Sequence, residues 1–249
     1  MRYPGLVSWY LTGSRQQRTT FWACFSGWAL DTFDAQLFSF LLPALIATWG
    51  VSKGEAGMLG TAALLSSALG GWVAGILSDR YGRVRVLLFT IGWFTLFSVL
   101  AGLTASYPQL LAVRVLQGLG FGGEWAVGAT LMAEVMAPAN RGKAVGLVQS
   151  GFSFGWAFAS ISATVILALF PQALAWRVAL WFCVVPALAV VFIRRNLEEP
   201  AVFLERKRTA SRGALAAFGS VFRRDVARHT VLASTVVLGF QASSFAIIN

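Results

Sequence analysis

Apolar runs long enough to cross a lipid bilayer recur along this chain of 249 residues. A transmembrane helix needs about 20 predominantly apolar residues. Hydrophobic residues make up 57% of the chain, charged residues only 12%, and the mean hydropathy is +0.69, which is too apolar for a domain that folds in water. We therefore predict an all-α membrane protein. The predicted spans are residues 21–49, 56–77, 86–105, 110–136, 144–170, 175–193 and 231–248.

Basic residues lie almost entirely on one side of these spans. If the N-terminus is cytoplasmic, 17 of the 20 Lys and Arg residues fall in inner segments, and the outer loops hold only Lys53 and Arg177. The positive-inside rule then predicts a multi-pass protein of the plasma (inner) membrane with a cytoplasmic N-terminus. The net charge of +10 is thus a topology signal and predicts no nucleic-acid partner.

The spans and this orientation divide the chain into four predicted parts. These are a cytoplasmic segment 1–20, a six-helix bundle 21–193, a cytoplasmic linker 194–228 and the start of a seventh helix at 229–249.

Two carboxylates, Asp31 and Asp34, lie in the middle of the first apolar run. On a helix they are about 60° apart around the axis and roughly 4.5 Å apart along it, so they share one face. A charge at the centre of a bilayer costs about 2.5–3.5 kcal/mol on insertion scales, and two neighbouring carboxylates cannot both ionise cheaply there. We therefore expect this pair to bind a proton and to serve in proton coupling, in preference to a purely structural role.

The fourth run carries a second set of polar residues at the same depth. Gln117 and Glu124 share a helix face, and Arg114 lies one turn before Gln117. An arginine suits a carboxylate substrate because its guanidinium binds both oxygens and stays charged. The alternative is that Arg114 neutralises an aspartate and locks two helices together. The expected substrate-binding residues are Arg114, Gln117 and Glu124, with Trp28 and Trp125 as stacking surfaces.

Glycines in the fourth run imitate a dinucleotide-binding fingerprint. Gly118, Gly120 and Gly123 have the required spacing, but they lie within an apolar span and do not follow a strand. We interpret Gly118 and Gly122 as a surface for close helix packing. The sequence shows no cluster of metal ligands and predicts neither a metal nor a cofactor; Cys24 and Cys183 are expected to be packing residues.

Charged residues also gather at the inner ends of the second and fourth spans. Glu134 is near enough to the cytoplasm to pair with an arginine, and opposite charges there would hold an inner gate shut. The loop after the second span reads Gly-Ile-Leu-Ser-Asp-Arg-Tyr-Gly-Arg-Val-Arg from Gly75 to Arg85. The expected gating residues are Asp79, Arg80, Gly82, Arg83, Glu134 and Arg141.

This loop closely resembles the signature between helices two and three of the major facilitator superfamily. The stretch from Arg114 to Glu124 resembles the second signature of the superfamily, and residues 140–143 follow in the expected order. The resemblance implies the six-helix N-terminal bundle of such a transporter, plus the start of a seventh helix. It also implies that the protein is not an enzyme.

The first span narrows the resemblance further. The stretch from Trp28 to Asp34 resembles the acidic motif of proton symporters for organic acids such as sialic acid, lactate and aromatic acids. The expected function is proton-coupled symport of a carboxylate, with the carboxylate, protons and the lipid bilayer as partners. A sugar porter is the alternative, because residues 196–203 vaguely resemble the linker motif of that group.

The chain has the length of one half of a superfamily transporter, since a second six-helix half does not follow. We therefore expect a missing C-terminal half, or a second copy of the chain, to be required for transport. A non-transporting fragment is the remaining alternative.

Overall fold

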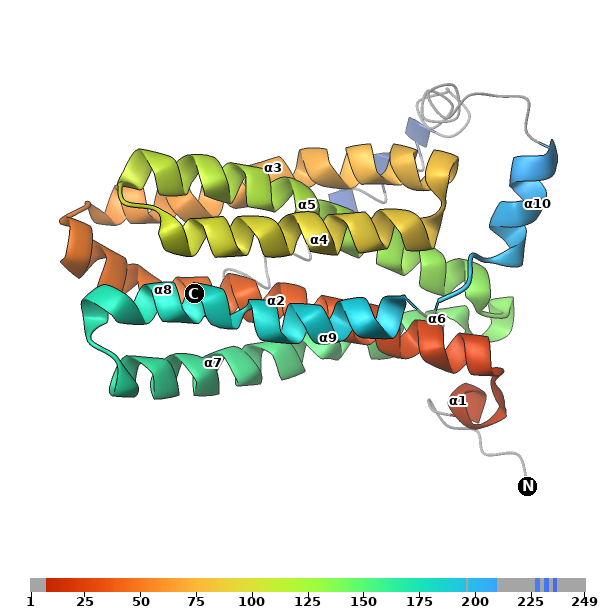
Figure 1. Ribbon diagram of the computed structural model, residues 1–249. Helices are drawn as coiled ribbons and strands as arrows, with labels where there is room; N and C mark the ends of the chain where they lie inside the picture. The colour runs from red at the N-terminus through yellow and green to blue at the C-terminus, as the bar shows by residue number, and fades with distance from the viewer. Residues whose placement is uncertain (1–7, 196, 210–226, 229–230, 233–234, 237–249) are drawn as a thin grey trace. The chain divides into compact units, whose positions relative to one another are not determined.

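The computed structural model describes residues 8–195, 197–209, 227–228, 231–232 and 235–236, and this part of the chain is helical without a strand (Figure 1). The prediction of an all-α protein is confirmed. Residues 210–226 of the predicted linker and most of the predicted seventh helix lie outside the described residues. Four spanning segments are single helices: α2 (Arg15–Trp49), α3 (Lys53–Tyr81), α4 (Arg83–Leu103) and α5 (Tyr107–Val135). The other two are helix pairs: α6 (Pro138–Gln149) with α7 (Gly151–Leu169), and α8 (Gln172–Phe182) with α9 (Val184–Arg194).

Two short helices flank this set, α1 (Ser8–Thr12) and α10 (Ala201–Thr209). All the spanning segments belong to the first of two compact units, Met1–Glu205 and Arg206–Asn249. Five of the six segments are long and apolar enough to cross a membrane, when α6 with α7 and α8 with α9 are each counted as one. The sixth, α5, is 29 residues long, or roughly 44 Å, and carries the charged residues predicted for the fourth span.

Local sequence signals set the ends of the first two spans. Ser14 accepts a hydrogen bond from the backbone N–H of Gln17, and the Gln17 side chain accepts one from Ser14, which forms a capping box at the start of α2. The helix ends at Gly50, whose φ of 66° is left-handed. Ser52 and Glu55 form a second capping box two residues later, so α3 begins at once and runs back antiparallel.

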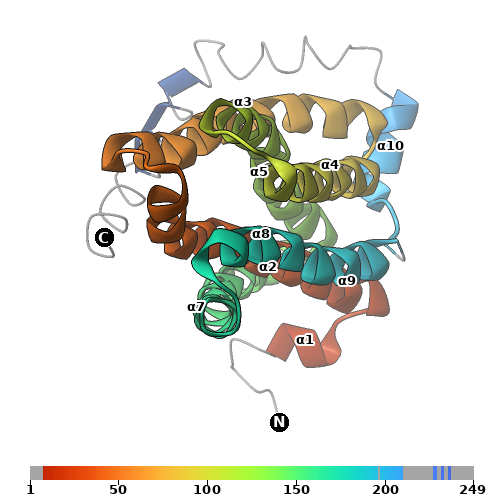
Figure 2. The ribbon, with the colours of Figure 1, turned by 60° about the vertical axis from the view of Figure 1, so that its left-hand side comes forward.

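Close packing through glycine joins α3 to α5. In Figures 1 and 2, α3, α4 and α5 lie together, and α2, α7, α8 and α9 form the neighbouring group. A Cβ atom at Gly122 would overlap the backbone carbonyl of Ser67 and come within 2.8 Å of the Gly71 nitrogen. The α3 and α5 backbones are therefore in direct contact, which agrees with the interpretation of Gly118 and Gly122 as a packing surface. Because α5 also packs against α2, the polar face of the first span is enclosed.

Candidate functional site

Six charged side chains are buried among the described residues: Asp31, Asp34, Arg83, Arg114, Glu124 and Arg194. Arg83 lies at the end of the bundle where α3 ends and α4 begins. The other five lie within the spanning helices, three acids with two arginines. A buried charge in an apolar bundle is expensive unless a partner compensates it, so the contacts of these five decide what the site can do.

The first group, here called the Asp34 cluster, joins α2, α4 and α5. Arg114 Nη1 donates to Asp34 Oδ2 at 3.3 Å and to Gln117 Oε1 at 2.7 Å. Gln117 Nε2 donates to Ser98 Oγ at 2.7 Å and makes longer contacts of 3.4 Å with both Asp34 oxygens. The Arg114 guanidinium lies 3.8 Å from the centre of the Phe38 ring. Asp34 is thus compensated by an arginine and an amide.

The second group, the Glu124 cluster, joins α2, α5 and α9. Arg194 donates through both terminal nitrogens to the two Glu124 oxygens, and its Nη1–Oε2 distance is 2.7 Å. Its Nη2 also donates to the backbone carbonyl of Ala23 at 3.0 Å. Arg194 is 1% exposed and Glu124 is 6% exposed. Glu124 therefore has a bidentate arginine partner inside the bundle.

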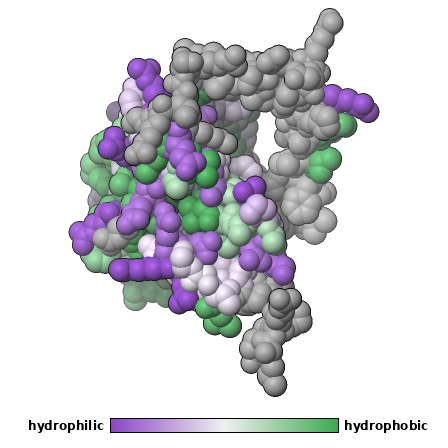
Figure 3. Space-filling view, turned by 90° about the vertical axis from the view of Figure 1, so that its right-hand side faces the viewer, coloured by the Kyte–Doolittle hydropathy of each residue, from purple (hydrophilic) through white to green (hydrophobic). Residues whose placement is uncertain are grey.

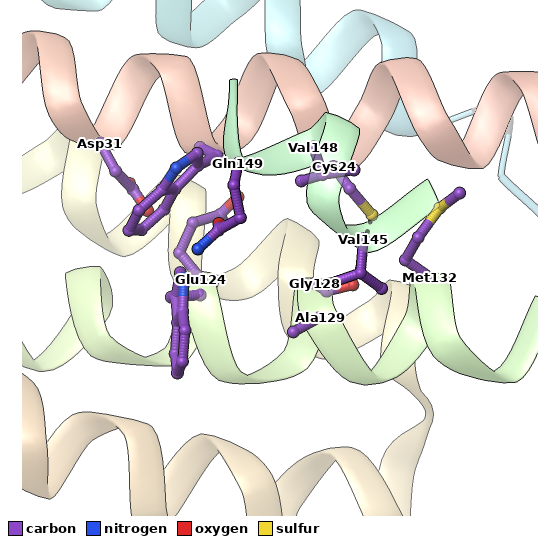
Figure 4. Close-up of a pocket in the computed structure, with 11 residues that line it drawn as sticks. Cys24, Asp31, Glu124, Gly128, Ala129, Met132, Val145, Val148 and Gln149 are labelled. Atoms are coloured by element: carbon purple, nitrogen blue, oxygen red, sulfur yellow. Dashed lines mark hydrogen bonds between the residues drawn. The ribbon is translucent and has the colours of Figure 1, made fainter. Parts of the chain in front are cut away.

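Asp31 belongs to neither pair. It is 2% exposed, its Oδ2 has no hydrogen-bond partner, and no ion pair joins it to another described residue. Its side chain lines a cavity of about 60 Å³ together with Glu124 and Cys24 (Figure 4). Such a volume is large enough to hold water. The site therefore contains one buried carboxylate without a compensating arginine.

Two indole rings lie beside this cavity. Trp28 and Trp125 both line it, with ring centroids 6.1 Å apart and planes tilted by 47°. Trp125 is 43% exposed, so one ring remains accessible as a stacking surface. Of the predicted coupling and substrate residues, the cavity contacts Trp28, Asp31, Glu124 and Trp125, whereas Asp34, Arg114 and Gln117 form the separate Asp34 cluster.

Arg194 is a site residue that the sequence does not predict. Its position at the end of an apolar run and beside Arg195 is typical of a positive-inside flank, so the sequence predicts that it lies in the cytoplasmic linker. The structure extends α9 to Arg194 and buries the side chain. The available signal was a glutamate in the fourth span without an evident partner.

A separate charged network lies where α3 ends. Arg83 Nε and Nη2 donate to the two Glu134 oxygens at 2.9 and 3.0 Å, and Nη2 also donates to Asp79 Oδ1 at 2.7 Å. The Arg83 side chain is only 3% exposed. We call Asp79, Arg83 and Glu134 the end network; it ties α3 and α4 to α5.

Glu199, after the last span, completes this end of the bundle. Its carboxylate accepts hydrogen bonds from the backbone N–H groups of Arg83, Val84 and Arg85, at 2.8 to 3.3 Å, and so caps α4. Gly82 has a φ of 114°, and a Cβ there would overlap the Glu199 carboxylate. The sequence predicts a linker here but not the cap.

Besides Gly82, two more residues predicted for gating, Arg80 and Arg141, lie outside the end network. Arg80 stacks on the Tyr81 ring at 5.3 Å, and Arg141 is exposed on α6. Hydrophilic side chains are prominent on the visible face at this end of the bundle (Figure 3). Among the described residues, no group of three or more His, Cys, Asp or Glu side chains could hold a metal ion.

A bundle of apolar helices with a charged site in its interior is the architecture of a membrane transport protein. The sequence profile of the Major Facilitator Superfamily matches residues 24–248, and the chain belongs to that superfamily. It is thus a multi-pass membrane protein of a family of transporters and not of enzymes, as the motifs predicted.

Named relatives agree with this assignment. A protein of Cupriavidus pinatubonensis named "Probable 4-methylmuconolactone transporter" is 59% identical over 98% of this chain and 56% of its own length. The "Cis,cis-muconate transport protein" of Acinetobacter baylyi is 29% identical over 92% of this chain and 55% of its own. The chain spans about half the length of the curated relatives it matches.

A solved structure shows the same fold. The partially occluded, inward-open xylose transporter XylE from E. coli superposes with a TM-score of 0.71 over 91% of this chain and 58% of the other chain. The two sequences are 19% identical, so the likeness concerns the fold alone.

Proposed function

We propose that the complete protein carries an organic carboxylate together with a proton across the plasma (inner) membrane, with its N-terminus in the cytoplasm. The observation that supports this proposal is Asp31, a buried carboxylate that forms no ion pair with another described residue and lies beside a cavity and two indole rings. With Asp31 ionised, the five buried charged side chains within the spanning helices include one more acid than arginine. An arriving anion would then meet an uncompensated negative charge, and a proton on Asp31 removes that repulsion. Anion and proton therefore bind favourably together.

The substrate class follows from the same surroundings. Indole faces suit a flat, unsaturated molecule, and the named substrates of two relatives, 4-methylmuconolactone and cis,cis-muconate, are of this kind. These names favour an organic acid over the sugar-porter alternative, because the xylose transporter shares only the fold.

The direct test uses the complete gene product in lipid vesicles with an alkaline interior. We expect accumulation of cis,cis-muconate or 4-methylmuconolactone above the outside concentration, and none of xylose. Accumulation of xylose without either acid would instead support the sugar porter.

Asp31→Asn separates coupling from substrate binding. Because asparagine imitates the protonated acid but cannot release a proton, we expect the variant to exchange labelled substrate across the membrane yet to lose accumulation driven by the pH gradient. Asp34→Asn should also lose accumulation, since it removes the partner of Arg114. The exposed acid Glu198 gives a matched control, Glu198→Gln, which should behave as the parent. Normal accumulation in both aspartate variants would exclude the coupling role.

Arg114→Lys tests how the carboxylate is held. The Arg114–Asp34 distance of 3.3 Å is longer than the roughly 2.7–2.9 Å of a strong charged pair, which supports the proposal that substrate replaces Asp34 on this arginine. Lysine keeps the charge but not the fork, so the substrate concentration for half-maximal uptake should rise about tenfold or more, with little change in protein level. Arg177→Lys, in α8 and away from the Asp34 cluster, serves as the control. Unchanged affinity would indicate that Arg114 only locks the two helices.

We also propose that the end network acts as the inner gate, holding the cytoplasmic ends of α3, α4 and α5 together. Asp79→Asn removes one of the two acidic partners of Arg83 in this network and should favour the state open to the cytoplasm. Cys24 is a natural reporter because it lines the cavity and is 4% exposed. In a Cys183→Ser background, maleimide labelling of Cys24 should increase severalfold in Asp79→Asn but not in Glu198→Gln. Equal labelling would assign the network to folding or insertion.

A further inference from the structure

Arg194 reaches Glu124 beside Gly27 of α2, where the helix carries no side chain. Its guanidinium passes close to Gly27, and a Cβ atom at that position would overlap both Arg194 Nη2 and Glu124 Oε1. Gly27 lies one turn from Cys24 and from Asp31 on the same helix. The missing side chain therefore makes room for a charged contact between α9 and α5 within the site.

The surroundings of Glu124 contain few other charges. Helix α2 presents Cys24 and Asp31, and α9 presents Arg194. The charges of Glu124, Arg194 and Asp34 all act on Asp31. Helix α6 contributes Val145, Val148 and Gln149 to the cavity wall, which carry no charge. Without Arg194, Glu124 and Asp31 would be two acids in one cavity, each able to take the proton.

We propose that Arg194 is a positioning residue of the transport site: it holds Glu124 as an ionised carboxylate in one orientation, so that Asp31 alone in this cavity takes up and releases the transported proton. The assignment of the transported proton rests on the proposed function. The pairing itself rests on the two-pronged contact with Glu124, the third bond to the Ala23 carbonyl and the opening at Gly27. Arg194 acts through Glu124 and need not touch the substrate.

The first experiment counts protonated carboxyl groups without requiring transport. Infrared spectra of the purified complete protein, without substrate and near neutral pH, are compared for the parent, Arg194→Gln and Arg194→Gln/Glu124→Gln. We expect one additional carboxylic-acid band in the single variant, absent again from the double variant. The neighbouring Arg195 is exposed, and Arg195→Gln is the matched control that should match the parent. A folded Arg194→Gln protein with the parent's spectrum would overturn the proposal.

If Arg194→Gln does not fold, Gly27→Ala makes the same test. The added methyl group displaces the guanidinium while both charged residues stay in the chain. The same additional acid band is expected, and an unchanged spectrum in a folded Gly27→Ala protein counts against the proposal.

The second experiment measures the number of protons carried with each substrate molecule. The proton-to-muconate ratio should rise in Arg194→Gln and return to the parent value in the double variant. A parent protein that carries muconate without protons would refute the proposed function, whereas the infrared comparison would still decide the role of Arg194. An unchanged ratio in Arg194→Gln, in a parent that does couple, would refute the positioning role alone.

Discussion

Compensation of buried charge governs this bundle. Three carboxylates lie inside the described spanning helices. Two of them form ion pairs with arginines, Asp34 with Arg114 and Glu124 with Arg194. Removing one partner of a buried pair costs about 3–5 kcal/mol, because the other charge is left alone in a low dielectric. The helices that contribute these side chains are thus held together by pairs as well as by apolar packing. Asp31 forms no ion pair with an arginine of the described residues, and a proton is the simplest way for it to become neutral.

The helix packing places the charges at the required distances. Direct backbone contact between α3 and α5 at Gly122 fixes the helix that carries Arg114, Gln117 and Glu124. The absence of a side chain at Gly27 leaves room for Arg194 of α9 to reach Glu124 beside α2. At the end of the bundle, Glu199 caps α4 and so steadies the segment that carries Arg83. Small residues and a cap therefore determine where the large charged residues can meet.

The sequence predicted the spans because apolar length is a local property, and it predicted that Glu134 could pair with Arg83 because the alternating spans place both residues on the same side of the membrane. It could not predict with which acid each arginine of the site forms an ion pair. Asp31 and Asp34 share a face of α2, yet they belong to different surroundings, since their neighbours come from α5 and α9. The Arg194–Glu124 pair joins residues 70 positions apart, and Glu199 caps a helix that begins 116 positions earlier. Such contacts depend on how the helices dock, which periodicity does not specify.

Under the proposed function, an organic acid crosses the membrane together with a proton. The most direct measurement is the pH of a lightly buffered suspension of vesicles containing the complete protein, recorded when cis,cis-muconate is added outside and no pH gradient is imposed. Entry of the acid with a proton should make the outside medium more alkaline, to an extent that saturates with muconate and that Asp31→Asn abolishes. Muconate uptake with no change in external pH would contradict the account.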